Sequence, residues 1–451
     1  MTLSYAAALA ALSERGRFGI RLGLGRIRAL LAELGHPEAG LRGALVAGTN
    51  GKGSVLALAD SVLREAGYRV GETPKPHLVS YRERLQIDGR PISAGRFAGL
   101  VSELLPVADL VAEAEGPPTE FELLTAMIFR WFAEEGIDLA LVEVGLGGRL
   151  DATHAWDGGV AAVTNVALDH TDRLGTTIEA IAGEKAAIIE RGDVAVTGAD
   201  EPALSIIRAR AEAVGAPLVV VTPPPIVGLD RDGIVVEMPE LGPTRVGLRG
   251  RHQAANVAVA DALLDALEQV GIAATTAEQR RAGFAAATWP GRLELLDVER
   301  PAGGTVEVLL DGAHNPAGAA TLAQALDDLR PFLKGGGDAK PPPLMLVMAV
   351  MADKDVAGIV RALASARSMA GVSIICTRLD LTRALDPAAL AGFWREAMPE
   401  ASSTVEPDPD RALDDALATA PGPLVVAGSL YLVGAVRARL VDDPLLRDPV
   451  A

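Results

Sequence analysis

Residues 43–66 read GALVAGTNGKGSVLALADSVLREA, and this stretch decides the fold class. The apolar run 43–47 is typical of a buried strand, and in 54–66 the apolar residues recur on one helical face. The loop between them is rich in glycine and contains Lys52. A strand, a glycine loop and a helix in this order predict a phosphate cradle. The loop N–H groups, the helix N-terminus and the lysine would all face an anion.

The loop differs by letter from the usual phosphate-loop pattern. Val46 stands where the first glycine is expected, and Gly53 separates Lys52 from Ser54. The alternative interpretation is a glycine turn with a solvated lysine. The flanking strand and helix favour phosphate binding.

Outward from this stretch, apolar runs alternate with helical patterns. We expect a helix over 124–133, and strands over 139–144 and 160–168 that are apolar enough for a parallel sheet covered on both faces. Thr176 and Glu179 resemble a capping box that opens a helix through residue 189. In 217–250, short runs at 219–222, 234–238 and 246–248 predict a small antiparallel excursion, with a tight turn at Asp232-Gly233.

A second alternating series begins near residue 297. Its strand candidates are 306–310, 344–350, 372–376 and 424–427, which predict a second α/β unit. We therefore expect two domains, residues 1–295 and residues 296–451.

Composition narrows the function classes. The 451 residues include 42 Lys and Arg against 59 Asp and Glu, a net charge of −17, which argues against nucleic-acid or anionic-membrane partners. Cys376 is the only cysteine, so no disulfide framework is possible within the chain. The first residues predict a helix and no signal peptide. No window is apolar enough to span a membrane. We expect a cytoplasmic enzyme or binding protein that acts as a monomer on small molecules.

Polar residues gather where the predicted strands end. Glu143 ends one apolar run and suits a Mg²⁺ ligand beside the phosphate loop, although a buried carboxylate is often simply ion-paired. Asp169-His170 ends the next run, and Lys185 follows on a helix, where spacing alone favours an ordinary surface lysine. In the second unit, Asp311 ends the first predicted strand, with His314 close behind.

These motifs together resemble a known family, the folylpolyglutamate synthase/dihydrofolate synthase enzymes of the Mur ligase superfamily. The resemblance runs in order along nearly the whole chain. Its motifs are Gly48-Thr-Asn-Gly-Lys-Gly-Ser54, Pro76-His-Leu78, Glu83-Arg84, Thr119-Glu-Phe-Glu122, Glu143-Val-Gly-Leu-Gly-Gly-Arg-Leu-Asp-Ala-Thr153, Leu168-Asp-His-Thr171, Glu184-Lys185, His252-Gln253, Asn256, Trp289-Pro-Gly-Arg292, Asp311-Gly-Ala-His-Asn-Pro316, Asp353-Lys-Asp355 and Gly428-Ser-Leu-Tyr431.

The resemblance implies an N-terminal P-loop ATPase domain with a parallel sheet and a small β excursion, followed by a C-terminal Rossmann-like α/β domain. It also implies the reaction. ATP phosphorylates a pteroate or folate carboxylate, and L-glutamate then displaces phosphate to form an amide. The implied cofactors are ATP and Mg²⁺.

The resemblance further assigns roles to single residues. The catalytic residues implied are Lys52, Glu143, His170 and Lys185. The nucleotide-binding residues implied are Asn50, Gly51, Lys52, Gly53, Ser54, Asn256, Arg292 and Asp311, with Lys75 as a further candidate. The metal ligands implied are Ser54, Glu143, His170 and Lys185 as a carbamate. The substrate residues implied are Gly19, Ile20, Arg21, Leu22, Thr119, Glu120, Phe121, Glu122, Leu150, Asp151 and Ala152 for the pteroate, and His314 and Ser429 for glutamate.

Two positions depart from the family pattern. Lys75 stands where the family commonly has a serine that ligates Mg²⁺, and a protonated lysine cannot be a ligand. Either water and phosphate hold the ion there, or the lysine's own charge acts on the phosphates. Arg21 replaces an acidic residue found in some relatives near the pterin.

Two other functions compete with this interpretation. A cell-wall Mur ligase would carry an additional N-terminal domain, for which a phosphate loop at residue 48 leaves no room. A nucleotide-dependent switch would make no amide and has no need of Lys185 or of the motif 311–316. The sequence leaves open whether the enzyme adds the first glutamate, later ones, or both.

Overall fold

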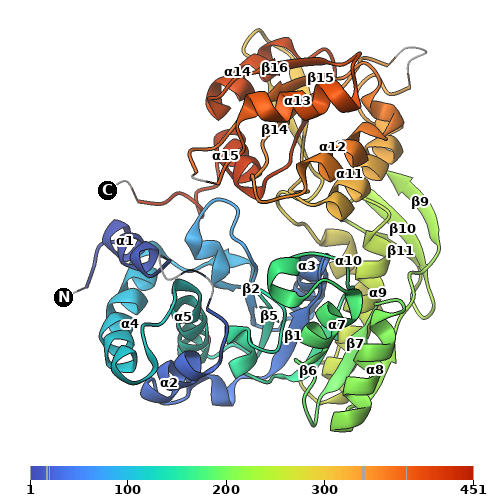
Figure 1. Ribbon diagram of the computed structural model, residues 1–451. Coiled ribbons are helices and arrows are strands. Elements are labelled where there is room, and N and C mark those ends of the chain that lie inside the picture. The colour runs from blue at the N-terminus through green and yellow to red at the C-terminus, as the bar shows by residue number, and fades with distance from the viewer. Residues whose placement is uncertain (1, 17–18, 20, 338–340, 382, 450–451) are drawn as a thin grey trace.

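The computed structural model describes residues 2–16, 19, 21–337, 341–381 and 383–449 (Figure 1). Figure 1 shows two lobes, the lower one containing the blue and most of the green segments and the upper one the orange and red C-terminal segments. Within the described part, no helix has both the length and the apolar character that crossing a bilayer requires.

The N-terminal lobe is built on an eight-stranded sheet of order β4-β3-β2-β5-β1-β6-β7-β8, in which the β2–β3 and β3–β4 pairs are antiparallel and the other pairs are parallel. The strands are β1 (Gly43–Ala47), β2 (Val70–Thr73), β3 (Gln86–Ile87), β4 (Arg90–Pro91), β5 (Leu139–Glu143), β6 (Gly159–Val163), β7 (Val194–Thr197) and β8 (Leu218–Val220). Its central strands are buried on both faces, as their unbroken apolar runs predict.

Helices cover both faces of this sheet. The helices α3 (Lys52–Glu65), α9 (Gln253–Gln269) and α10 (Ala277–Ala286) pack on one face. The other face carries α1 (Tyr5–Gly16), α2 (Gly25–Glu33), α4 (Ala94–Glu115), α5 (Glu120–Glu135), α7 (Ile178–Ala186) and α8 (Ala203–Val214). The short helix α6 (Thr171–Leu174) precedes α7. Short 3₁₀ turns lie at 37–40, 81–84, 152–155, 330–332 and 367–369.

The predicted β excursion exists, and the strand expected over 234–238 is confirmed, whereas the one expected over 246–248 lies earlier in the chain and a further strand precedes both. It is an antiparallel sheet of β9 (Ile226–Asp230), β10 (Gly233–Met238) and β11 (Gly242–Val246). The run expected at 219–222 lies in β8, which instead pairs parallel with β7 at the edge of the main sheet. The sequence could not reveal this, because a three-residue strand has the same pattern in either setting.

The C-terminal lobe has a six-stranded sheet of order β12-β13-β17-β14-β15-β16, parallel except for β12. Its strands are β12 (Glu294–Glu299), β13 (Thr305–Leu310), β14 (Met345–Met348), β15 (Ser373–Cys376), β16 (Ser402–Val405) and β17 (Leu424–Ala427). The helices α11 (Pro316–Leu329), α12 (Val356–Ala364) and α13 (Pro387–Ala397) cover one face, and α14 (Pro409–Thr419) and α15 (Leu430–Leu440) cover the other. The fold is the predicted α/β architecture with two parallel-rich sheets.

Other expectations were wrong in detail. The strand expected over 160–168 ends at Val163, so Asp169 and His170 lie in the loop beyond it. The cap of α7 is Thr177, whose side chain accepts a hydrogen bond from the N–H of Ala180, and α7 ends at Ala186 rather than residue 189. The division of the chain at residue 295 stays a prediction, although that residue lies inside β12.

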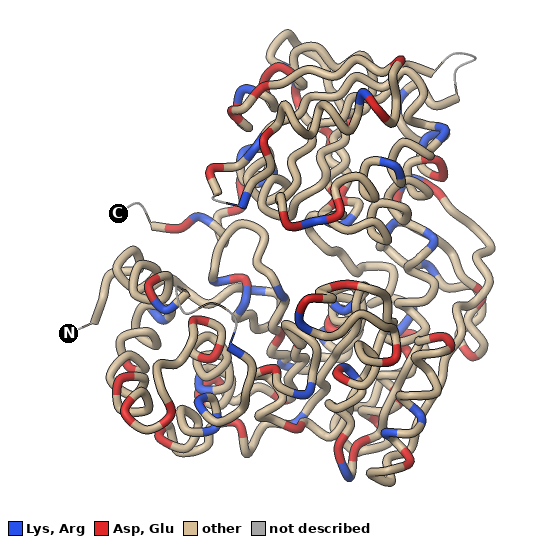
Figure 2. Tube along the Cα trace, viewed as in Figure 1, with Lys and Arg blue, Asp and Glu red and all other residues tan. Residues whose placement is uncertain are grey.

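Polar contacts join the lobes at several points. Asn315 donates to Asp169 at 3.2 Å, and Arg251 pairs with Asp328 at 2.7 Å. The C-terminal tail returns to the N-terminal lobe, where Asp448 accepts from Arg82 at 3.0 Å. Figure 1 accordingly shows both termini on the same side of the molecule, and Figure 2 shows charges of both signs interspersed over both lobes.

The contact between α3 and α10 yields a stability prediction. A Cβ added at Gly283 would lie 2.5 Å from the Cα of Val62, which is backbone and cannot yield, whereas nothing lies within 4 Å of a Cβ at Gly183 in α7. We expect Gly283→Ala to lower the free energy of unfolding by about 1–3 kcal/mol through overpacking. Gly183→Ala should raise it by up to about 1 kcal/mol through helix propensity. Urea unfolding of both variants measures whether the free energy of unfolding falls in one and rises in the other. Stabilisation by Gly283→Ala would refute the close approach of Gly283 to Val62.

Candidate active site

A cavity of about 1130 Å³ lies between the lobes, where strands of both parallel sheets end. Most of the predicted site residues line this one cavity. Those that line it are Gly19, Arg21, Leu22, Asn50, Gly51, Lys52, Gly53, Ser54, Lys75, Thr119, Glu120, Phe121, Glu122, Glu143, Leu150, Asp151, Ala152, His170, Lys185, Asn256, Arg292, Asp311 and His314. Ile20 lies outside the described residues.

Ser429 is the predicted residue that the structure does not bring to the wall. Its side chain is buried at 2 % exposure where α15 begins, and the next two residues, Leu430 and Tyr431, line the cavity instead. The sequence could not separate these neighbours, because the direction in which each side chain points depends on the turn that precedes the helix.

The glycine loop is held in shape by the loop that follows β6. The backbone N–H of Thr49 donates to the carbonyl of Asn165 at 2.9 Å, and that of Asn50 donates to the Asn165 side chain at 2.9 Å. Gly51 has φ +83°, and a Cβ there would lie 2.3 Å from the side-chain oxygen of Asn256 on α9. The loop therefore requires glycine at this point both for its backbone conformation and for the close approach of α9.

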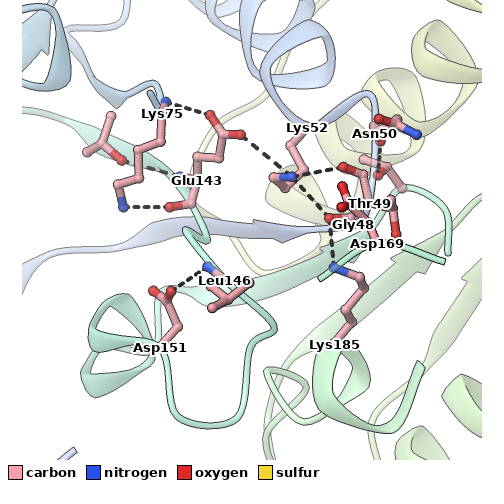
Figure 3. A network of polar contacts seen from close by, with 12 residues as sticks. Gly48, Thr49, Asn50, Lys52, Lys75, Glu143, Leu146, Asp151, Asp169 and Lys185 are labelled. Carbon is pink, nitrogen blue, oxygen red and sulfur yellow. Dashed lines mark hydrogen bonds and ion pairs between the residues drawn. The ribbon is translucent and has the colours of Figure 1, made fainter. Parts of the chain in front are cut away.

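Two lysine ammonium groups reach the same backbone carbonyl of this loop (Figure 3). Lys52 Nζ donates to the oxygen of Gly48 at 3.0 Å and to that of Thr49 at 3.2 Å. Lys185 Nζ, from α7, donates to the oxygen of Gly48 at 2.9 Å. Lys185 is 5 % exposed, and burial lowers the pKa of its ammonium to about 7. Lys185 is thus not the surface lysine that its spacing alone favours.

Glu143, at the end of β5, contacts both Lys75 and Lys52. Its carboxylate accepts the backbone N–H of Lys75 at 2.8 Å and lies 3.9 Å from Lys52 Nζ. Burial raises the pKa of Glu143, while Lys52 and the Lys75 contacts oppose that shift. This carboxylate therefore lies beside the phosphate loop, as predicted, and it also forms an ion pair with Lys52.

Lys75 points away from the glycine loop. Its Nζ donates to the backbone carbonyl of Glu143 at 2.7 Å and lies 4.8 Å from the centre of the Phe121 ring. Burial lowers the pKa of Lys75 to about 8, and the negative charges of Asp151 and Glu143 oppose the shift. Figure 3 shows Lys75 and Lys52 approaching Glu143 from different sides.

The segment expected on the acceptor side begins a helix. Thr119 and Glu122 form a capping box at the start of α5, in which the Thr119 N–H donates to Glu122 at 2.7 Å. Arg26 also donates to Glu122, at 3.0 Å. Asp151 accepts hydrogen bonds from Leu146 and Thr153. These two carboxylates therefore fix the wall's shape, while Glu120 and Phe121 form its surface.

The opposite wall comes from the hinge and the C-terminal lobe. Asp311 accepts the N–H groups of Leu293 and Ala313, both at 2.9 Å. A Cβ at Gly312 would lie 2.1 Å from the guanidinium of Arg292, so a larger residue there would displace that cation. Burial raises the pKa of Asp311, and the charge of Arg292 opposes the shift. Arg292 and Asp311 thus lie together, as their predicted shared role requires.

Comparison with known proteins agrees with this geometry. Residues 46–223 match the model of the Mur ligase middle domain, and residues 294–440 match that of the dihydrofolate synthetase C-terminal domain. The dihydrofolate synthase/folylpolyglutamate synthase of Mycobacterium tuberculosis is 36% identical, covering 93% of this chain and 90% of that protein. The enzyme of the same name from Bacillus subtilis is 39% identical over 72% of this chain and 77% of that protein.

The chain belongs to the dihydrofolate synthase/folylpolyglutamate synthase family. Solved structures support the same conclusion. Folylpolyglutamate synthase of M. tuberculosis, complexed with ADP and AMPPCP, superposes with a TM-score of 0.82 at 33% identity, covering 98% of this chain and 100% of that one. FolC of E. coli, in complex with DHPP and ADP, gives 0.79 at 30% identity, covering 97% and 99%.

The chain is therefore an ATP-dependent ligase of the Mur ligase type that uses ATP with Mg²⁺. Both alternatives considered from the sequence, a cell-wall ligase and a switch that makes no amide, are less well supported than this family.

Residues that the sequence did not single out also position the site of this ligase. Asn165 fixes the glycine loop, and the amide of Asn315 spans the lobes to Asp169. Glu72 is 3 % exposed on β2, lines the cavity, and has no hydrogen-bond or ion-pair partner among the described residues. Burial and the nearby carboxylates of Asp60 and Glu143 raise the pKa of Glu72 well above its ordinary value. The sequence around Glu72, Val70-Gly-Glu-Thr73, carries no apolar run that would mark this carboxylate as buried.

The position of Lys52 leads to a prediction for nucleotide affinity. Since its ammonium is already held against the loop carbonyls, Lys52→Ala should weaken AMPPCP binding at least about tenfold through loss of a charge-assisted contact. Isothermal titration with Mg²⁺ measures the affinity, with Lys334→Ala, an exposed lysine of the other lobe, as the control. An unchanged affinity in Lys52→Ala would place the phosphates elsewhere.

Proposed function

We propose that this ligase joins L-glutamate to the carboxylate of dihydropteroate, to tetrahydrofolate and its polyglutamates, or to both. One observation carries the proposal. The nucleotide loop, the acceptor segment 119–122 and the strand-end residues Asp311 and His314 all line one cavity. A nucleotide, an acceptor acid and an amino acid can therefore meet there.

The proposed reaction has two steps, phosphorylation of the acceptor carboxylate and then formation of the amide. An acceptor carboxylate oxygen attacks the γ-phosphorus of ATP, the bond from that phosphorus to the bridging oxygen breaks, and ADP leaves with the electron pair. The glutamate nitrogen then attacks the acyl carbon and loses a proton, and inorganic phosphate leaves with the carbon–oxygen bond's electrons. A cavity between two lobes limits hydrolysis of the acyl phosphate by bulk water.

Positive charge is the main contribution of this chain to the first step. Lys52 and Arg292 lie where they can neutralise charge on the transferred phosphoryl group. Asn50, Gly51, Gly53 and Asn256 complete the nucleotide site that we propose. For glutamate we propose His314, which lines the cavity, with Tyr431 beside the position expected for Ser429.

The residues present fit a magnesium ion held partly by substrate. Ser54 and Glu143 bring side-chain oxygens to the cavity wall, and oxygen is the donor that Mg²⁺ prefers. Among the described residues no group of three or more acidic, histidine or cysteine side chains could hold a metal. We therefore propose that phosphate oxygens and water supply the remaining ligands, and that the ion neutralises charge on the phosphates.

A second cation would lie beside His170 and Lys185, which also line the cavity. We propose that Lys185 carries a carbamate there, because its lowered pKa leaves much of the amine neutral and able to add CO₂. We also propose that the enzyme acts as a monomer in the cytoplasm. Size-exclusion chromatography with light scattering tests the first of these two statements.

The function itself is tested by phosphate release. We expect release to require ATP, glutamate and a pterin acceptor together, because the acyl phosphate forms only on the bound acceptor. A comparison of dihydropteroate with tetrahydrofolate identifies the preferred acceptor. Lys52→Ala serves as the inactive control. Phosphate release that ignores both glutamate and acceptor would instead support a nucleotide-dependent switch.

The carbamate has its own test. Protein equilibrated with ¹³C-bicarbonate should show a carbamate signal by NMR that is absent from Lys185→Ala. The same variant should lose ligation while its circular dichroism and melting temperature stay near those of the wild type. Near-normal ligation by Lys185→Ala would refute the metal role, whatever the NMR result.

A further inference from the structure

Lys75 has more hydrogen-bonding capacity than the protein uses. An ammonium group carries three donors. Among the described residues, the Nζ of Lys75 makes one hydrogen bond, to the backbone oxygen of Glu143 at 2.7 Å, and a contact with the face of Phe121. Since Lys75 lines the cavity, its remaining donors are available to a bound molecule.

The neighbouring carboxylates are engaged elsewhere. Asp151 accepts from the Leu146 N–H at 2.7 Å with one oxygen, and from the Thr153 N–H at 3.0 Å and hydroxyl at 2.6 Å with the other. Glu143 accepts the backbone N–H of Lys75 with one carboxylate oxygen, and its other oxygen faces Lys52. Neither carboxylate forms a salt bridge with the Lys75 ammonium.

The direction of the side chain separates it from the nucleotide loop. Lys52, on the other side of the Glu143 carboxylate, already contacts the carbonyls of Gly48 and Thr49. Lys75 instead lies against Phe121 and near Asp151. These two residues belong to the segments 119–122 and 150–152, which the resemblance assigns to the acceptor. Figure 3 shows this separation of the two lysines by Glu143.

We propose that Lys75 binds the reacting carboxylate of the acceptor, and that it is an acceptor-binding residue rather than a nucleotide-binding one. This proposal rests on the proposed function and specifies its acceptor site. The ammonium would hold the carboxylate against Phe121 and offset its repulsion of the γ-phosphate. A protonated lysine suits this task because it neutralises one unit of charge without competing for the metal ion.

The test compares ligands that differ only at that group. Affinity is measured by isothermal titration for dihydropteroate and for its carboxamide, with AMPPCP and Mg²⁺ present and no glutamate. The wild type should prefer the carboxylate by about tenfold or more, as expected for a charge-assisted hydrogen bond. Lys75→Met should lose this preference, while its AMPPCP affinity stays within about twofold of the wild type. Lys75→Arg should retain it.

Control variants keep the result interpretable. Lys334→Met, which removes an exposed lysine of the other lobe, should leave both affinities unchanged. If Lys75→Met does not fold, Lys75→Gln replaces it with the same readout. A purely structural role would weaken both ligands equally and would overturn the proposal. So would a persisting carboxylate preference in Lys75→Met, or a loss confined to AMPPCP.

The outcome is independent of turnover. No ligation occurs without glutamate, so a wild type that prefers the carboxylate supports the acceptor site even if the phosphate-release assay fails. Conversely, the wild type could show full ligation and yet bind dihydropteroate and its carboxamide equally well. That result would leave the proposed function intact and overturn the role of Lys75.

Discussion

The site depends on three lysine side chains that line one cavity, in a chain whose net charge is −17. The ammonium groups of Lys52 and Lys185 share the carbonyl of Gly48, and Lys75 contacts the carbonyl of Glu143. Like charges this close repel, and burial adds a desolvation cost. The backbone carbonyls and the carboxylates of Glu143 and Asp151 offset part of this cost. The lysine groups are therefore suited to bind anions such as a triphosphate and a carboxylate.

The two lobes supply what neither could offer alone. Parallel strands of both sheets end at the cavity, as is general for ligand sites in α/β folds. The direct link from Asn315 to Asp169 is a single neutral-to-charged hydrogen bond at 3.2 Å. The returning tail at Asp448 is more strongly held, with contacts to Ser80 at 2.7 Å and to Arg82 at 3.0 Å. The lobes are thus joined by the returning tail as well as by contacts beside the cavity, among them the packing of Leu78 against the C-terminal core.

The sequence was most informative where backbone chemistry dominates. The glycine loop after β1 was predictable because close approach to an anion demands glycine and a helix N-terminus, and both appear as letters. The end of β6 was not, since apolar residues return at 166–168, beyond Thr164 and Asn165 and outside the sheet. Nor was the direction of Lys75, which is set by the position of Glu143 on β5, 68 residues away in sequence. Asn165 was missed because a single asparagine in a loop carries no periodic signal.

The repulsion between the acceptor carboxylate and the γ-phosphate is large enough for a lysine beside the acceptor to matter. Two unit negative charges about 4 Å apart, in surroundings of effective dielectric constant about 20, repel by about 4 kcal/mol. This repulsion opposes the approach of the acceptor carboxylate to the γ-phosphate. Cations bound only to the nucleotide neutralise the phosphate charge and leave the carboxylate charge unpaired. Lys75 lies across Glu143 from Lys52, so it can act on the attacking acid directly. Lys52 thus neutralises charge on the nucleotide and Lys75 neutralises charge on the acceptor acid. The carboxylate of Glu143 lies between the two lysines and reduces their mutual repulsion.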